Sequence, residues 1–421
     1  MTNAITAIRG FNDILPKEAR LWRFIEETAL RVFRGYGFEE VRLPIVEKTE
    51  LFCRTIGETT DIVEKQMYTF EDLHGDSLSL RPEGTATAVR AYVENRLDLE
   101  TPVNKLFYSG PMFRYERPQK GRYRQFYQLG AEVLGEASAK IDAELIAMLN
   151  EFFLELGVKG IDIEINTLGC RDCRGAYRDA LLDFLSIKKE ALCDNCKRRM
   201  IRNPLRALDC KAAGCIEATQ EAPTIDNDLC GCCKEHFTEL KDTLELLGVR
   251  YKINPRMVRG LDYYSRTAFE VTALSTSEGG VLGSQNSIAA GGRYDSLVGE
   301  LGGSATPCVG LAIGMERLAM LVEKELVKTV PLTYIVVMDD DGYKEGARVA
   351  ALIRGEGVRV IVDYKGGKLK SLMKRAHKSN ADFVIIIGED ELSSGLLTLK
   401  VMATGEQFGL KTESLLEKIA V

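Results

Sequence analysis

The placement of strand-forming sequence constrains the fold of this chain more than any other feature. Sequence patterns mark strands as far as Ile161–Ile165, including Glu40–Leu43 and Gln125–Leu134, and strand-like sequence resumes only at Arg250–Ile253. A hairpin is predicted around Gly75, and a helix from Ala139 to Leu156. Between Ile165 and Arg250 no strand pattern is visible, the sequence is locally basic, and nine of the eleven cysteines fall between Cys170 and Cys233. The pattern therefore predicts a sheet domain that is interrupted by a helical insertion.

A second change of character lies at about residues 327–332. Beyond it, strand and helix patterns alternate from Tyr334–Met338 to Phe383–Ile387, which is typical of a small α/β domain with a largely parallel sheet. The predicted class is α+β. The predicted domains are a sheet domain of residues 1–169 and 250–326, a Cys-rich helical insertion of residues 170–249, and an α/β domain of residues 331–421.

Length and composition exclude several classes of protein. A chain of 421 residues is too long for one hydrophobic core, and 45% hydrophobic with 28% charged residues is ordinary globular composition. The longest apolar stretches fall far short of the ~20 residues of a membrane helix, and the first residues lack a signal-peptide pattern. We expect a cytoplasmic protein. Its net charge of −6, taken alone, argues against a nucleic-acid partner.

The most informative segment joins two predicted strands. Five cations and one acid, Glu116, lie between Arg114 and Arg124. Arginine forks fit pairs of phosphate oxygens, although such a run could also be a solvated hairpin tip. On the returning strand Gln128, Gly130 and Glu132 alternate and share one face, which favours a ligand floor over a packed core.

Four further segments have both a functional and a structural interpretation. The paired glycines Gly291 and Gly292 could let the backbone approach a ligand closely. Arg317 follows a strand at the start of a predicted helix, where an anion is favoured. Glu83 precedes a helix and could simply cap it, and the tyrosines of Arg259–Tyr264 could be buried structural residues.

Together these segments resemble one family, in content and in order. Three segments resemble the three signatures of class II aminoacyl-tRNA synthetases: Gly37–Pro44, Phe113–Glu116 with its returning strand, and Gly310–Leu318. Two further segments, Arg259–Tyr264 and Ala290–Asp295, resemble the two peptides that are special to histidyl-tRNA synthetases. The resemblance runs from Arg9 to the end of the chain.

The resemblance implies a fold and a reaction. The fold would be an antiparallel sheet flanked by helices, with a helical insertion and a C-terminal α/β anticodon-binding domain, in a homodimer formed through the first signature. The reaction would join L-histidine to ATP as an adenylate and pass the acyl group to the 3′ end of tRNA(His). A buried carboxylate that accepts from the imidazole would reject other amino acids by ~10⁴–10⁵, so that no editing domain is needed.

The resemblance also assigns roles to residues. The catalytic cations that hold the phosphates and the carboxylate would be Arg114, Arg259 and Arg317, with Mg²⁺ bridging phosphate oxygens. ATP would be bound by Arg114, Glu116 and Arg317. Histidine would be bound by Glu83, Thr85 and Gln128 at its α-ammonium and by Glu132, Tyr263 and Tyr264 around its imidazole.

Two further basic stretches, Lys197–Lys211 and Lys365–Lys378, are candidates for binding tRNA. Either could be a solvated face, but the family's insertion approaches the acceptor arm and its C-terminal domain binds the anticodon. The predicted tRNA-binding residues are Arg122, Lys370, Lys374 and Arg375. None of the three histidines falls in a motif, and we expect all three in turns or on the surface.

The cysteines predict a structural zinc site. Two C-x-x-C pairs, Cys193 with Cys196 and Cys230 with Cys233, have suitable spacing, and reduced, partly buried thiols are the alternative. Cys170 and Cys173 add a third pair, and the sequence does not decide whether Cys210 or Cys215 joins a site.

Two other functions remain open at this level. One is the non-catalytic, synthetase-like regulatory subunit of ATP phosphoribosyltransferase, which usually lacks or degrades the Arg259–Tyr264 peptide and the residues after Leu332. The other is an RNA-binding protein, which would leave Arg114, Arg317 and Glu83 without a role.

Overall fold

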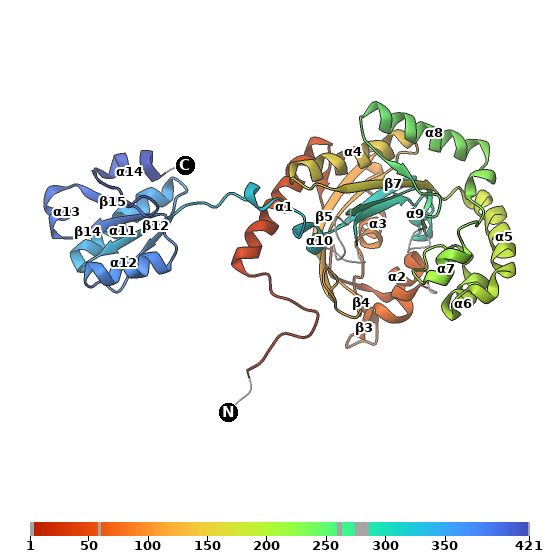
Figure 1. Cartoon of the computed structure of the whole chain (residues 1–421), viewed down its shortest axis with the longest axis horizontal. Coiled ribbons are helices and arrows are strands. Elements are labelled where there is room, and N and C mark those ends of the chain that lie inside the picture. The colour runs from red at the N-terminus through yellow and green to blue at the C-terminus, as the bar shows by residue number, and fades with distance from the viewer. Residues whose placement is uncertain (1–3, 58–59, 259–262, 274–285, 420–421) are drawn as a thin grey trace. The chain divides into compact units, whose positions relative to one another are not determined.

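The computed structural model describes residues 4–57, 60–258, 263–273 and 286–419 (Figure 1). The chain forms two compact units, Met1–Val327 and Lys328–Val421. In the described part of the chain, no helix is both long enough and apolar enough to span a bilayer.

An eight-stranded sheet organises the first unit. Its order is β1-β5-β6-β11-β10-β9-β7-β8, and neighbours are antiparallel except for the outermost pairs β1–β5 and β7–β8. The strands are β1 (Glu39–Glu40), β5 (Asn104–Phe113), β6 (Gln125–Leu134), β7 (Ile161–Thr167), β8 (Lys252–Ile253), β9 (Ser265–Ala273), β10 (Ser287–Arg293) and β11 (Cys308–Gly314). The strand that the sequence predicts at Glu40–Leu43 is wrong in extent, because only Glu39 and Glu40 pair with β5.

Within the described residues, a small antiparallel sheet and ten helices complete this unit. The small sheet has the order β2-β4-β3, with β2 (Val46–Lys48), β3 (Tyr68–Glu71) and β4 (Ser77–Leu80), and confirms the predicted hairpin around Gly75. The helices are α1 (Pro16–Gly35), α2 (Thr49–Ile56), α3 (Thr85–Glu94), α4 (Ala139–Glu155), α5 (Arg171–Ile187), α6 (Asp194–Arg202), α7 (Ala213–Ala218), α8 (Gly231–Leu246), α9 (Leu297–Glu300) and α10 (Met315–Ala319).

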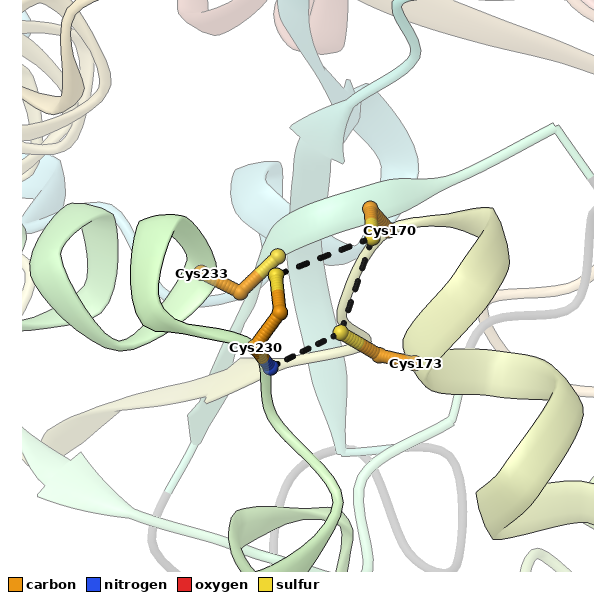
Figure 2. Close-up of side chains that lie close together, drawn as sticks. All are labelled: Cys170, Cys173, Cys230 and Cys233. Atoms are coloured by element: carbon orange, nitrogen blue, oxygen red, sulfur yellow. Dashed lines mark hydrogen bonds between the residues drawn. The ribbon is translucent and has the colours of Figure 1, made fainter.

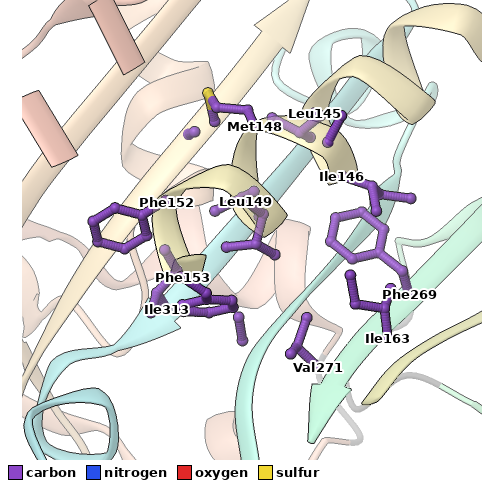
Figure 3. Close-up of a cluster of buried hydrophobic side chains, with 14 of the residues drawn as sticks. Leu145, Ile146, Met148, Leu149, Phe152, Phe153, Ile163, Phe269, Val271 and Ile313 are labelled. Atoms are coloured by element: carbon purple, nitrogen blue, oxygen red, sulfur yellow. The ribbon is translucent and has the colours of Figure 1, made fainter. Parts of the chain in front are cut away.

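Helix α4 builds the main core against one face of the large sheet (Figure 3). The helix begins at Ser138, whose side chain accepts a hydrogen bond from the Lys140 amide. Its apolar face includes Leu149 and Phe152 and packs toward strand residues such as Phe269 and Ile313. Because side chains alternate along a strand, the residues next to Ile313, Ala312 and Gly314, face the opposite side of the sheet. That opposite side holds the candidate site.

The insertion has a core of its own. Residues of α5, α6 and α7 form a separate apolar cluster that includes Tyr177, Leu181 and Met200. Helix α8 instead lies against α4, and its Phe237, Leu240 and Leu244 belong to the main core. The chain therefore leaves the large sheet after β7 and returns to it through α8.

The second unit is a five-stranded sheet with helices on both faces. Its order is β13-β12-β14-β15-β16, in which β13, β12 and β14 are parallel and the last two strands antiparallel, so the predicted α/β unit with a largely parallel sheet is confirmed. The strands are β12 (Leu332–Val337), β13 (Arg359–Val362), β14 (Phe383–Ile387), β15 (Leu397–Val401) and β16 (Gln407–Leu410). The helices are α11 (Asp340–Gly355), α12 (Leu369–Lys378), α13 (Glu389–Ser394) and α14 (Thr412–Ile419).

Candidate active site

A cavity of about 310 Å³ lies on the face of the large sheet opposite α4. Small residues of the central strands, Ala290 on β10 and Ala312 on β11, leave room for it and lie opposite each other in the ladder. The strand-to-strand loop of residues 114–124, the start of α3 and the start of α10 supply its charged lining. The structure thus brings three of the predicted motifs to one place.

Three guanidinium groups, those of Arg114, Arg122 and Arg317, line this cavity. Arg114 donates to the Pro82 carbonyl at 2.9 Å and stacks over the Phe126 ring. Arg317 donates to the carbonyls of Ser287 at 2.6 Å and Gly121 at 3.1 Å. Backbone acceptors therefore fix the orientation of both side chains.

The positive charges of these arginines repel one another, and burial together with this repulsion lowers the pKa of Arg122 and Arg317. Burial lowers the pKa of Arg317, and the nearby charge of Arg114 lowers it further. Burial, Arg114 and Arg317 act in the same direction on the pKa of Arg122. Positive charge that is concentrated and partly desolvated in this way favours a polyanionic ligand. Glu116, also in the lining, accepts from Arg122 and offsets part of the charge.

Glu83 caps a helix, as one interpretation of the sequence predicts, and its side chain also lines the cavity. Its carboxylate accepts from the backbone amides of Thr85 at 2.7 Å and Ala86 at 2.9 Å, so it caps α3. It also lines the cavity, and burial raises its pKa although these hydrogen bonds and Arg114 act in the opposite direction. A buried carboxylate at a cavity wall suits a cationic group of a ligand.

Gln128 lies in the same wall and offers an unused acceptor. It pairs in register with Gly314 of β11. Its Oε1 atom is buried and has no hydrogen-bond partner among the residues that the structure describes. Buried polar atoms are seldom left unpaired, so this oxygen suits a donor on a bound ligand.

Glu132 is on the predicted face of β6 but lies behind the cavity rather than in its lining. The intervening position is Gly130, and the Tyr108 ring fills the space over it. A Cβ at Gly130 would come within 2.1 Å of that ring, and one at Gly84 within 2.2 Å. Tyr108 is therefore held between two glycines, which separates Gln128 from Glu132.

The carboxyl group of Glu132 is fully buried and surrounded by hydroxyl donors. Thr85 donates to it at 2.8 Å, Tyr108 at 3.0 Å, and Tyr294 from the other side. Burial raises its pKa to about 8 although these three hydroxyls oppose the shift. Pairing with an imidazole would thus require one of the three hydrogen bonds to be exchanged for the new one.

Tyr263 and Tyr264 both line the cavity. Their ring centroids lie 4.7 Å apart, and Tyr263 also contacts the Tyr294 ring at 5.7 Å. Arg259, predicted to be catalytic, lies outside the described residues. The backbone around Tyr264 is anchored from the insertion, since Arg174 of α5 donates to its carbonyl oxygen at 2.8 Å.

The paired glycines of β10 approach neighbouring strands, which favours their structural interpretation, and neither is part of the cavity lining. A Cβ at Gly291 would lie 2.3 Å from the Gly310 carbonyl oxygen, and one at Gly292 would lie 2.4 Å from that of Thr267. The next residue, Arg293, is fully buried and ion-paired with Asp142 at 2.5 Å. This peptide holds the sheet together.

The predicted tRNA-binding residues lie in different environments. Arg122 lines the cavity. Lys370 and Lys374 are exposed on α12. Arg375, on the same helix, donates to both carboxylate oxygens of Asp363, at 2.6 and 2.9 Å, and is therefore a structural anchor.

The predicted four-cysteine zinc site is divided by the structure between two clusters. Cys230 and Cys233 lie with Cys170 and Cys173, whereas Cys193 and Cys196 lie with Cys210 and Cys215. The sequence spacing identified each C-x-x-C pair, but the tertiary structure determines which cysteines lie next to each pair.

Sequence reasoning missed several residues of the site. Glu316 lines the cavity, accepts from the Tyr127 amide at 2.9 Å, and burial raises its pKa to about 7. Its position beside Arg317 was the available signal. Tyr294 lies in the Ala290–Asp295 peptide, and that resemblance was its signal, whereas Tyr108 and Arg174 gave none. The predicted surface position of His236 is also wrong, because it is buried 3.6 Å from Asp142, and burial lowers its pKa to about 4.

Comparisons with known proteins agree with this architecture over nearly the whole chain. A family model described as histidyl-tRNA synthetase matches residues 10–318, and one described as anticodon binding domain matches residues 333–421. The histidine–tRNA ligase of Trichlorobacter lovleyi is 53% identical over 404 residues, which cover 96% of this chain and 95% of the relative. That of Geobacter sulfurreducens is 52% identical over 403 residues, or 96% of each chain.

Solved structures show the same fold. Apo histidyl-tRNA synthetase of S. aureus has a TM-score of 0.81 and 33% identity, with 99% of this chain and 100% of the other covered. A Bacillus halodurans protein titled ATP phosphoribosyltransferase regulatory subunit/histidyl-tRNA synthetase has a TM-score of 0.66 over 92% of this chain and 99% of the other. At 20% identity it shows the fold alone.

The large antiparallel sheet with its arginine-lined cavity, joined to an α/β anticodon-binding domain, defines a class II aminoacyl-tRNA synthetase. Within this class the chain belongs to the histidyl-tRNA synthetase family, because that family's model matches residues 10–318 and relatives at about half identity cover 96% of the chain.

Proposed function

We propose that this chain acts as a histidine–tRNA ligase, and that the cavity on the large sheet is where histidine and ATP react. The observation that carries the proposal is the meeting of three guanidinium groups with a buried carboxylate and an unpaired amide oxygen in one cavity. The cations suit the triphosphate of ATP, and Glu83 with the Gln128 oxygen suits the α-ammonium of an amino acid. An anionic and a cationic substrate group can thus be bound side by side.

The first step is the in-line attack of the histidine carboxylate on the α-phosphorus. A carboxylate–phosphorus bond forms, the bond to the bridging oxygen breaks, and pyrophosphate leaves with the electron pair. Negative charge grows on the phosphoryl oxygens, where Arg114 stabilises it, with Arg259 assigned to the same task. Arg317 and Arg122 are proposed to hold the outer phosphates, with Glu116 near the nucleotide.

Mg²⁺, which synthetases of this family generally use, fits the carboxylates of the cavity. Mg²⁺ prefers oxygen ligands and commonly takes one or two carboxylates together with substrate phosphates. Glu116 and Glu316 provide such oxygens beside the three arginines. The bound ion would neutralise phosphate charge.

The second step transfers the histidyl group to the terminal ribose of tRNA(His), and AMP leaves. The imidazole is proposed to lie between Tyr263, Tyr264 and the buried Glu132, exchanging one of the hydroxyl contacts of that carboxyl group. The α/β unit is proposed to bind the anticodon through Lys370 and Lys374. A cytoplasmic homodimer formed through the first signature completes the proposal.

Histidine-dependent exchange of pyrophosphate into ATP tests the first step, and charging of tRNA(His) tests the second. We expect both activities with histidine and neither with other amino acids. A protein that shows no histidine-dependent exchange, but changes the activity of an ATP phosphoribosyltransferase, would be the regulatory paralogue instead. Binding of tRNA without exchange would indicate an RNA-binding protein.

A further inference from the structure

Eight of the nine cysteines in the insertion form two groups of four. The first group is Cys170, Cys173, Cys230 and Cys233, and Figure 2 shows these side chains pointing toward one another. The second group is Cys193, Cys196, Cys210 and Cys215. Within each group all four sulfur atoms lie within 4.8 Å of one another.

Three of the sulfur–sulfur distances lie close to the edge length of a tetrahedron around one ion. Zn–S bonds of about 2.3 Å in tetrahedral geometry place ligand sulfurs about 3.8 Å apart. In the first group Cys170 lies 3.5 Å from Cys173 and 4.0 Å from Cys230, and in the second Cys193 lies 3.9 Å from Cys210. A disulfide would need about 2.05 Å, and none of the eleven cysteines, all of which lie in the described part of the chain, forms one.

Both groups share an arrangement that aims the sulfurs inward. In the first, Cys170 is the N-cap residue of α5 and Cys230 that of α8, and each helix supplies a second cysteine three positions later. The Cys230 amide donates to the Cys173 sulfur at 3.2 Å, and the Cys193 amide donates to the Cys215 sulfur at 3.1 Å. Amide donors of this kind stabilise thiolate charge, which reduced core thiols would not need.

The insertion also has a physical need for such cross-links. Its separate core is built from a few short helices of a segment of roughly 60 residues, and a core of that size is marginal without added staples. Four of the eight cysteines are buried within this core, where a bound ion would replace missing apolar volume: Cys173, Cys196, Cys215 and Cys233.

We propose that the insertion holds two structural zinc ions, each bound by four cysteine thiolates in the two groups named above. The first site joins the point where the chain leaves the large sheet to the point where it returns. The second site holds α6 and α7 together within the insertion. Four thiolates leave no open coordination position, so both sites are structural rather than catalytic.

The first site also lies next to the wall of the cavity where Tyr263 and Tyr264 are proposed to bind the imidazole. Arg174, the residue after Cys173, donates to the Tyr264 carbonyl oxygen. The Leu168 amide donates to the Arg266 carbonyl oxygen, and the Arg266 amide donates to the Gly169 carbonyl oxygen. The backbone just before the insertion is therefore paired with β9, the strand that follows Tyr264. Zinc at the first site would therefore hold one wall of the pocket in place.

Metal analysis of the full-length protein tests the proposal. We expect two zinc ions per chain, falling to one in Cys173→Ser/Cys233→Ser and to one in Cys196→Ser/Cys215→Ser. Because buried variants can fail to fold, Cys170→Ser/Cys230→Ser, which changes the two less buried ligands of the first site, should give the same loss. After chelation, Co²⁺ should bind with the absorption bands of tetrahedral thiolate coordination.

The matched control is Cys232→Ser. Cys232 is exposed and lies only 3.1 Å from the Cys230 sulfur, yet it belongs to neither group, so two zinc ions should remain. Wild-type protein without stoichiometric zinc, iron in place of zinc, or zinc content that the double variants leave unchanged would overturn the proposal. Loss of zinc in Cys232→Ser would overturn the assigned ligands.

Discussion

The loop of residues 114–124 and helix α12 look alike in sequence and differ completely in structure. The loop has five cations with one acid, and the stretch Lys365–Lys378 has six cations with none. In the loop, Arg114 and Arg122 line a cavity together with Arg317, fixed by carbonyl and carboxylate acceptors. On α12, Lys370 and Lys374 are exposed, and only Arg375 is held by a carboxylate.

The difference shows that burial, more than charge density, decides what a basic stretch can do. Fixed and partly desolvated guanidiniums are preorganised for charge that develops in a transition state. Exposed ammonium groups attract a polyanion through interactions that salt screens over about 8–10 Å. The first arrangement suits catalysis, and the second suits the binding of an extended nucleic acid.

Removing a partly buried cation of the cavity should have the largest effect. Arg114→Ala and Arg317→Ala should each lower kcat for histidine-dependent pyrophosphate exchange by about 10²–10³-fold, because a preorganised donor to the phosphates is removed. Lys159→Ala, which removes an exposed cation paired with Glu323, is the matched control and should retain full activity. Activity of the arginine variants within tenfold of wild type would remove the contrast between the two regions.

Arg375→Ala should mainly affect stability. Its hydrogen bonds tie α12 to Asp363, so their removal should lower the free energy of unfolding of the second unit. Hydrogen exchange of α12 and denaturant unfolding measure this change. The neighbouring Lys374→Ala should alter stability by less than about 0.5 kcal/mol. Equal effects of the two substitutions would mean that Arg375 is not an anchor.

Lys370→Ala/Lys374→Ala should act on tRNA alone. Exposed ion pairs contribute about 0.2–1 kcal/mol each, so KM for tRNA should rise by about twofold to thirtyfold, with pyrophosphate exchange unchanged. The slope of log K against log salt should flatten by about 0.7–0.9 for each phosphate that the protein no longer neutralises. Lys344→Ala, an exposed cation paired with Asp341 in the same unit, should change neither quantity. An unchanged KM and slope would exclude α12 from the tRNA surface.

The smallest expected effect is on the acid stability of the second unit. Burial alone would raise the pKa of Asp363, but hydrogen bonds from Arg375, the Lys365 amide and Tyr334 lower it overall. A carboxylate whose pKa is lower in the folded state stabilises that state above its unfolded pKa, about 3.9, and the contribution disappears as pH falls through the folded value. Unfolding curves below pH 4 should show this loss in wild type and less of it in Arg375→Ala.

Much of the fold could be predicted because its signals are local. Helix α4 and strand β6 were predicted from local sequence patterns, and both appear within a residue of the expected limits. Glu83, Gln128 and Arg317 were singled out by their positions beside a helix or on one strand face, together with the family resemblance, and all three line the cavity. Glu132 was placed on the correct face of its strand, but its separation from the cavity depends on Tyr108 of another strand.

The residues whose environment the sequence did not reveal share one cause. Gly291 and Gly292 are adjacent in sequence, but the atoms that need their space belong to Gly310 and Thr267. His236 looked like a surface residue because nothing near it in sequence indicates that α8 packs against α4 beside Asp142. In each case the deciding contact is distant along the chain.

The sequence by itself determined the residue types, the order of the strands and helices along the chain, and the C-x-x-C pairs, since each depends on spacing within a few residues. Only the tertiary structure decided which pairs meet. It joined Cys170 and Cys173 to Cys230 and Cys233, some 60 residues away, because α8 returns to the large sheet beside the start of α5. It likewise left the arginines of the cavity partly buried and Lys370 and Lys374 of α12 exposed. Burial and long-range pairing arise from packing, which local sequence does not specify.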